Sequence, residues 1–198
     1  MKLLHLDIET APHTAFVWGL FKQNISIKHL IETGRVMCLA AKWHGQKDTE
    51  FYAEWDKGGH VDMIHKAYEL LNEADAVVHY YGTNFDIPTL NAAFAQYGLT
   101  PPSPIKQIDL CRVVRRNFRF PSNKLDYVAQ RFDLGSKTSH EGFQLWIDCM
   151  NNKPAAQKKM GIYNRQDVRL LEKLYNKLLP WINNHPNHGL YMDSDKPV

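Results

Sequence analysis

The chain has 198 residues, 44% hydrophobic and 23% charged, which is enough for one globular domain with a full core. These values exclude a disordered chain, a collagen-like repeat and a coiled coil. The 24 Lys and Arg residues exceed the 21 Asp and Glu residues by three, a surplus too small to indicate or exclude a nucleic-acid partner.

The cysteines and the N-terminus bear on where the protein works. Cys38, Cys111 and Cys149 are widely spaced and odd in number, which favours a reducing compartment over a disulfide framework. The N-terminus reaches acidic residues too early for a signal peptide, and no apolar run approaches a membrane span. We therefore expect a cytoplasmic protein without membrane association, and we take it to be a monomer.

The chain begins with the pattern of a β-strand. Residues 2–9 alternate, with aliphatic side chains on one face, and the other face carries Leu3, His5, Asp7 and Glu9. Residues 13–34 are aromatic-rich and are expected to be irregular. Further strands are expected at 35–43, 49–55, 76–81 and 106–110. Helices are expected at 60–73, 86–97, 109–117, 123–132, 141–150 and 154–179.

This order of elements predicts the fold class. A hairpin followed by βαβ units and then helices is typical of an α/β protein with a mixed five-stranded sheet flanked by helices. Residues 1–182 are expected to form the domain, and residues 183–198 are expected to form a polar C-terminal tail.

Asp7 and Glu9 form the first pair that composition does not explain. Carboxylates at positions i and i+2 of a strand point the same way, so they repel each other and resist burial. A divalent cation removes both penalties, because hard cations prefer oxygen ligands. The alternative is a strand end that emerges into solvent.

Two later segments add acidic residues. Asp86 begins a helix after a strand, where an acidic residue also serves as a cap. Tyr163 and Asp167 lie four apart on one helix face, although Asp167 would also suit an exposed ion pair. Taken together with Asp7 and Glu9, the positions can converge at the edge of a mixed sheet. Four carboxylates with room for water are what a two-metal phosphodiester hydrolase needs.

Three segments match a known pattern in order and spacing. The stretches DIET at 7–10, NFDIPTL at 84–90 and YNRQD at 163–167 resemble the three motifs of the DEDD 3′–5′ exonucleases, which have a ribonuclease H-like fold. The Y-x-x-x-D form of the third motif resembles the DEDDy branch, which includes proofreading domains of DNA polymerases. The resemblance covers about residues 1–180. It is greatest to stand-alone exonucleases of phage or bacterial type, which implies the cytoplasm of a bacterium or of a phage-infected cell.

The resemblance implies roles for five residues. Asp7, Glu9 and Asp167 would hold one of two divalent ions, Mg²⁺ or Mn²⁺. Asp7 would bridge to the second ion and Asp86 would support it, while Tyr163 would orient the attacking water.

The sequence departs from the family at one position. Where relatives often carry Asn, five residues before Asp86, this chain has Tyr81. Asn84 is a candidate to replace that Asn in binding the terminal nucleotide.

The strongest local charge bias lies between residues 106 and 124, which hold six basic residues and one acidic residue, with Phe118 and Phe120 interleaved. Basic residues along a backbone with aromatic stacking are typical of single-strand binding. The alternative is a solvated helix face with two core phenylalanines. The candidate nucleic-acid contacts are Thr10, Trp18, Asn84, Phe85, Arg112, Arg115, Arg116, Arg119 and Lys124.

Two groups of residues have an open interpretation. The aromatic residues of segment 13–34 could contact nucleic acid, by stacking on terminal bases or by wedging strands apart. The alternative is that they cover the core. The histidines show no zinc-binding spacing, so His5 and His79 are interpreted as structural residues.

The expected function is a metal-dependent 3′–5′ exonuclease that releases nucleoside 5′-monophosphates from single-stranded 3′ ends, with DNA only weakly favoured over RNA. The alternatives are an RNA-directed or structure-selective nuclease on the same site, and a non-catalytic nucleic-acid-binding module.

Overall fold

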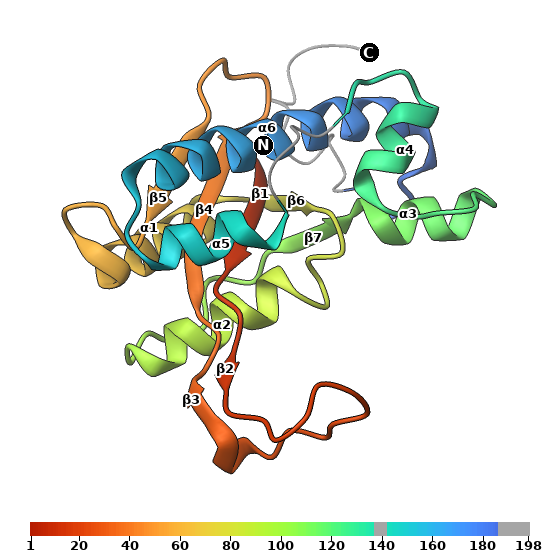
Figure 1. Cartoon of the computed structure of the whole chain (residues 1–198). Coiled ribbons are helices and arrows are strands. Elements are labelled where there is room, and N and C mark those ends of the chain that lie inside the picture. The colour runs from red at the N-terminus through yellow and green to blue at the C-terminus, as the bar shows by residue number, and fades with distance from the viewer. Residues whose placement is uncertain (137–141, 186–198) are drawn as a thin grey trace, which may run out of the picture.

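The computed structural model describes residues 1–136 and 142–185. It contains a five-stranded sheet in the order β5-β4-β1-β6-β7 (Figure 1). These strands are β1 (Leu3–Thr10), β4 (Val36–Trp43), β5 (Glu50–Ala53), β6 (Ala76–His79) and β7 (Lys106–Asp109). Strand β4 is antiparallel to β1 and β5, whereas β6 is parallel to β1 and β7. The predicted α/β class with a mixed five-stranded sheet is confirmed.

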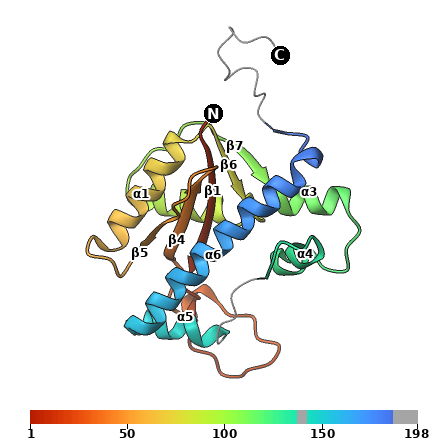
Figure 2. The same ribbon diagram turned by 90° about the horizontal axis from the view of Figure 1, so that it is seen from above.

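Helices cover both faces of the sheet (Figure 2). On one face lie α1 (Gly59–Glu73) and α2 (Asp86–Gln96), which share a hydrophobic core with β1 and β4. On the other face lie α3 (Leu110–Asn117), α4 (Leu125–Arg131) and α6 (Pro154–Leu178). Helix α5 (Phe143–Met150) packs against α6. The structure therefore has three layers, and α6 crosses the sheet over β1 and β4.

Strand β1 is central, so both of its faces are covered. Leu4 and Leu6 are fully buried toward α1 and α2, while Leu3 and His5 are buried on the side of α6. Because alternate residues of a strand point to opposite faces, Asp7 and Glu9 face the α6 side as well. The strand end does not simply emerge into solvent, since Asp7 and Glu9 are half-buried.

Residues 14–32, here called the arm, differ from the expectation of irregular chain. Strand β2 (Thr14–Ala15) pairs with β3 (Leu30–Glu32), with a short 3₁₀ turn at Ile27–His29. A ladder this short, with a register shift, leaves no alternation to detect in the sequence. The aromatic residues of the arm do not cover the core, because Phe16, Trp18 and Phe21 are 78%, 99% and 85% exposed.

Three smaller expectations can be compared with the structure. All three cysteines are buried and unpaired by disulfides. Among the described residues, no helix has both the length and the apolar character needed to cross a bilayer. Of the predicted tail at 183–198, residues 186–198 lie outside the described residues, and the amide of Asn184 donates to the carbonyl oxygen of Gln107 at 2.9 Å.

Candidate active site

Three carboxylates from distant parts of the chain meet between β1 and α6. Asp7 and Glu9 of β1 and Asp167 of α6 each present an oxygen within 4.8 Å of the others. Asp167 is almost fully buried, because its position on α6 faces the sheet. Like charges this close are destabilising unless a cation or a proton compensates them. An all-oxygen donor set of this charge fits Mg²⁺ or Mn²⁺.

Asp86 joins this group indirectly. It is the first residue of α2, whose N-cap is Phe85, and it is 4% exposed. Its carboxylate accepts a hydrogen bond of 3.2 Å from the backbone N–H of Ile8, which lies between Asp7 and Glu9. Burial raises the pKa of Asp86 to about 7, although backbone hydrogen bonds partly oppose the shift. Asp86 is therefore tied to the same strand but lies outside the group of mutually close oxygens.

Asn164 is a site residue that the motif analysis missed. Its side chain is fully buried, and its Nδ2 donates to Oδ2 of Asp7 at 2.7 Å. The same Nδ2 lies 3.4 Å from the carbonyl oxygen of Asp7. Asn164 precedes Asp167 by three residues, so the helical period places both on one face of α6, and this spacing was the available signal. A neutral donor here fixes one oxygen of Asp7 without adding charge.

Tyr163 lies one turn before Asp167 and is also buried. Its ring packs edge-on against Trp146 of α5, with ring centroids 6.0 Å apart. Helix α5 thus limits the positions that the phenol can take beside the carboxylates.

Asp109 is a second residue that sequence reasoning missed. It ends β7 and caps α3 by accepting hydrogen bonds from the N–H groups of Cys111 and Arg112, at 3.0 and 3.3 Å. It also accepts from the N–H groups of Tyr81 and Thr83, at 2.9 and 3.4 Å. One buried carboxylate therefore holds the turn between β6 and α2, which leads to Asp86.

Tyr81, the departure from the family pattern, has a left-handed backbone with φ of 68°. This conformation costs an L-residue about 1–2 kcal/mol, and Asn tolerates it better than Tyr. The hydrogen bond to Asp109 and the guanidinium of Arg115, 5.2 Å from the ring centroid of Tyr81, hold the residue in place.

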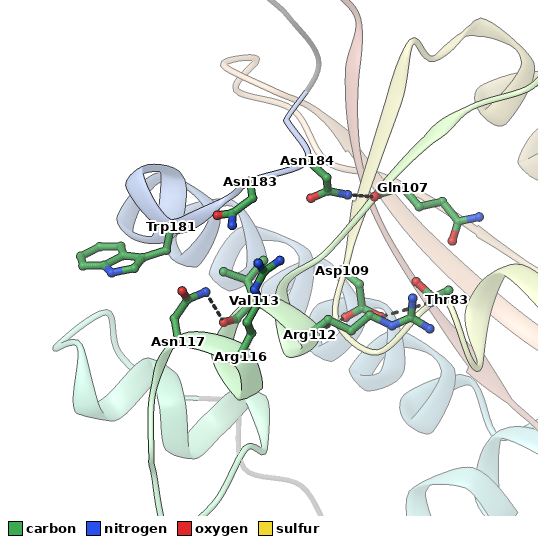
Figure 3. A pocket seen from close by; sticks show the side chains of 10 residues that line it. All are labelled: Thr83, Gln107, Asp109, Arg112, Val113, Arg116, Asn117, Trp181, Asn183 and Asn184. Carbon is green, nitrogen blue, oxygen red and sulfur yellow. Dashed lines mark hydrogen bonds and ion pairs between the residues drawn. The ribbon is translucent and has the colours of Figure 1, made fainter.

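The candidate nucleic-acid contacts fall into separate places. Thr10 and Phe85 line one groove of about 880 Å³. Arg112 donates to Oδ1 of Asn84 at 3.0 Å, and with Arg116 it lines a pocket of about 280 Å³ beside Asp109 (Figure 3). Further residues of the basic stretch are exposed: Arg115, Arg119 and Lys124. Trp18 lies on the arm.

Phe118 and Phe120 are partly buried and pack against the hydrophobic core, which is nearer to the alternative interpretation than to exposed stacking platforms. Their rings stack on each other with centroids 5.4 Å apart, and both pack edge-on against Phe132. These ring contacts at the margin of the core occupy the ring faces and edges that base stacking would need.

A family model matches residues 4–179, which include β1, α2 and α6. The chain belongs to the RNase_H superfamily. A family B DNA polymerase from the hyperthermophilic archaeon Pyrobaculum calidifontis superposes on 90% of the chain with a TM-score of 0.67 at 20% identity. The DNA polymerase delta catalytic subunit of Schizosaccharomyces pombe is 27% identical over 77 residues, which are 39% of this chain. The chain covers 24% of the former protein and 7% of the latter.

Proposed function

We propose that this RNase_H superfamily chain is a divalent-metal-dependent exonuclease that removes nucleoside 5′-monophosphates from the 3′ end of single-stranded nucleic acid. The observation that carries the proposal is the convergence of Asp7, Glu9 and Asp167. Asp86 joins them through its hydrogen bond to the backbone N–H of Ile8. The partial similarity to a DNA polymerase subunit supports DNA as the substrate.

The residues present suit the chemistry. Asp7, Glu9 and Asp167 would hold Mg²⁺ or Mn²⁺, with Asp86 in support. When bound, such ions activate water and stabilise the charge that develops on the phosphate. Tyr163 would orient the attacking water by a hydrogen bond, because a phenol with an ordinary pKa of about 10 is a poor base at neutral pH.

The groove between the end of β1 and the start of α2 would receive the terminal nucleotide. It opens beside Thr10 and Phe85, the residues that directly follow Glu9 and precede Asp86. The exposed arginines of α3 would then bind the phosphates upstream of the terminal nucleotide. Charge attraction to phosphate is independent of base sequence.

The test is digestion of strands labelled at either end, with Mg²⁺ or Mn²⁺, using single-stranded DNA, duplex DNA and RNA. We expect stepwise shortening from the 3′ end of single-stranded DNA and none with a chelator. Degradation of RNA alone would support the RNA-directed alternative. Binding without degradation in either metal would support the non-catalytic module.

Replacing Tyr163 by Phe should slow turnover by about 10- to 100-fold, since it removes only the phenol that orients the water. The ring still packs against Trp146, so the melting temperature should stay within a few degrees. Single-turnover rates measure the effect. A wild-type rate would remove the proposed role of Tyr163.

Reversing the charge of Arg115 and Arg116 together should weaken binding of single-stranded DNA. Each lost phosphate contact should also lower the slope of log affinity against log salt by about 0.7. The matched control reverses Lys47 and Lys57, which are exposed near the opposite edge of the sheet. If both double variants bind alike in a salt titration, the basic stretch is ordinary surface.

A further inference from the structure

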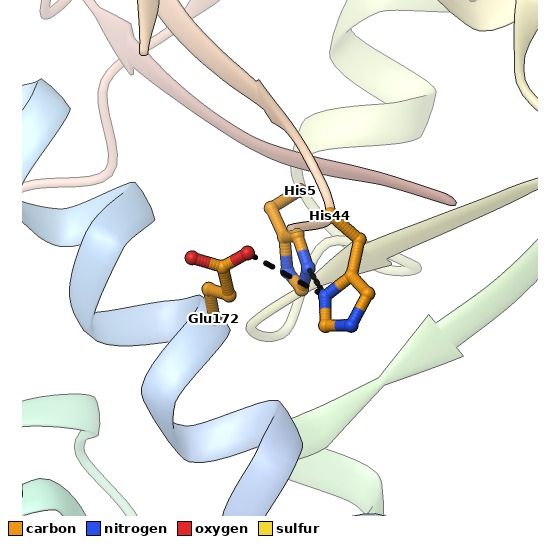
Figure 4. Close-up of side chains that lie close together, drawn as sticks. All are labelled: His5, His44 and Glu172. Atoms are coloured by element: carbon orange, nitrogen blue, oxygen red, sulfur yellow. Dashed lines mark hydrogen bonds and ion pairs between the residues drawn. The ribbon is translucent and has the colours of Figure 1, made fainter. Parts of the chain in front are cut away.

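Two histidines and a glutamate gather at a second place between β1 and α6. His5 comes from β1, His44 from the turn after β4, and Glu172 from α6, and their donor atoms lie within 4.8 Å of one another (Figure 4). We propose that His5, His44 and Glu172 form a binding site for a zinc-class transition-metal ion, separate from the carboxylates of the candidate active site.

The spacing of the donor atoms suits a four-coordinate ion. Nε2 of His5 lies 3.2 Å from Nδ1 of His44, which lies 3.5 Å from Oε1 of Glu172. Zinc bonds of 2.0–2.1 Å in a tetrahedron place neighbouring ligand atoms about 3.3 Å apart. The donor atoms all lie within 4.8 Å of one another, so the side chains would have to close by at most about 1.5 Å to surround an ion.

The chemistry of the donors separates this site from the active site. Two imidazoles and one carboxylate suit zinc, cobalt or nickel, whereas an all-carboxylate set suits magnesium or manganese. The carboxylate is already held, because Oε2 of Glu172 lies 2.6 Å from Nζ of Lys42 and Oε1 accepts from the N–H of Gly45 at 2.9 Å. Contacts of this kind orient metal ligands in known sites.

The surroundings fix the two imidazoles and leave one of them open to solvent. His5 is fully buried, and its Nδ1 has no hydrogen-bond partner among the described residues. The ring of Tyr175 packs edge-on against both imidazoles, which fixes their planes. The side chain of His44 is 37% exposed, so an ion has a path from solvent. The charge of Lys42 and the bare Nδ1 weaken the site, and we expect affinity well below that of a fully enclosed zinc centre.

An ion here would tie together the two elements that carry the active site. His5 precedes Asp7 by two residues on β1, and Glu172 follows Asp167 by five on α6. The expected role is structural, since an ion that binds only the folded state raises the free energy of unfolding of the protein.

Titration of the Asp7→Asn variant with Co²⁺, in a buffer that contains excess Mg²⁺ to occupy carboxylate sites, tests the proposal. Four-coordinate cobalt gives an intense visible absorption, whereas cobalt in an octahedral carboxylate site absorbs weakly. We expect one equivalent to bind with intense absorption, Zn²⁺ to displace it, and His44→Ala in the same background to abolish it. His65→Ala, at an exposed position of α1, should leave the absorption unchanged.

The result is independent of nuclease activity, because the readout is absorbance in a variant that the proposed function makes inactive. Absence of the intense band, or an equal band after His44→Ala, would overturn the zinc-class site and leave the exonuclease proposal standing. Zn²⁺ should also raise the melting temperature of the parent but not of the His44→Ala variant. An equal rise in both proteins would likewise contradict the site.

Discussion

Replacing Asp7 by Asn should lower exonuclease activity by about 10³-fold. This is the upper end of the loss of about 10²- to 10³-fold that removing one transition-state-stabilising group causes. Asp7 accepts a hydrogen bond from Asn164, and one of its oxygens lies within 4.8 Å of oxygens of Glu9 and Asp167. The same change removes one of three crowded negative charges, so the metal-free protein should melt at the same or a higher temperature. The labelled-strand assay and a melting curve measure the two effects together.

The opposite directions of these two effects make the result specific. A variant that lost activity by unfolding would melt at a lower temperature, and Asp7→Asn should not. Asp48→Asn, at an exposed turn between β4 and β5, removes the same charge far from the site and should leave the rate unchanged. Activity of Asp7→Asn within tenfold of the parent would show that the carboxylate group is not the reaction centre.

Replacing Asn164 by Leu should reduce Mn²⁺ affinity and activity by about 10- to 100-fold, as loss of a residue that orients a metal ligand does elsewhere. Leu has the branched shape of Asn and a somewhat larger volume, and it lacks the N–H donor to Oδ2 of Asp7. That oxygen is then free to turn toward Glu9 and Asp167. Calorimetric Mn²⁺ titration reports the affinity, and steady-state rates report the activity.

A purely structural role for Asn164 predicts a different pattern. In that case the melting temperature would fall while Mn²⁺ affinity per folded molecule stayed constant. If Asn164 positions Asp7, higher Mn²⁺ concentrations should restore part of the rate. Asn91→Leu, on an exposed position of α2, serves as the matched control.

The sequence predicted those parts of the site that depend on the side-chain period of a single strand or helix. The two-residue period of β1 indicated that Asp7 and Glu9 share a face, and the helical period did the same for Tyr163 and Asp167. The structure places Asp7, Glu9 and Asp167 together. Asn164 obeys the same period, but an uncharged residue inside an acidic motif gave no reason to single it out.

Other features depend on tertiary contacts that no local pattern records. Asp109 counted as the single acid within a basic stretch, yet its role comes from backbone N–H groups 26 and 28 residues away. His5 and His44 are 39 residues apart, too far for any zinc-binding spacing. The sequence also did not decide whether Trp18 is buried or exposed, since large aromatic residues are usually at least partly buried.

The contact between Asp7 and Asn164 spans 157 residues of chain, which sets when the site can form during folding. Closing so long a loop is entropically costly and depends on prior collapse of the intervening elements. The strands can pair and bury β1 before α6 docks, but the carboxylate group cannot exist until that helix arrives. During synthesis, tight divalent-ion binding should therefore emerge only after α6 has left the ribosome, long after the sheet has begun to form.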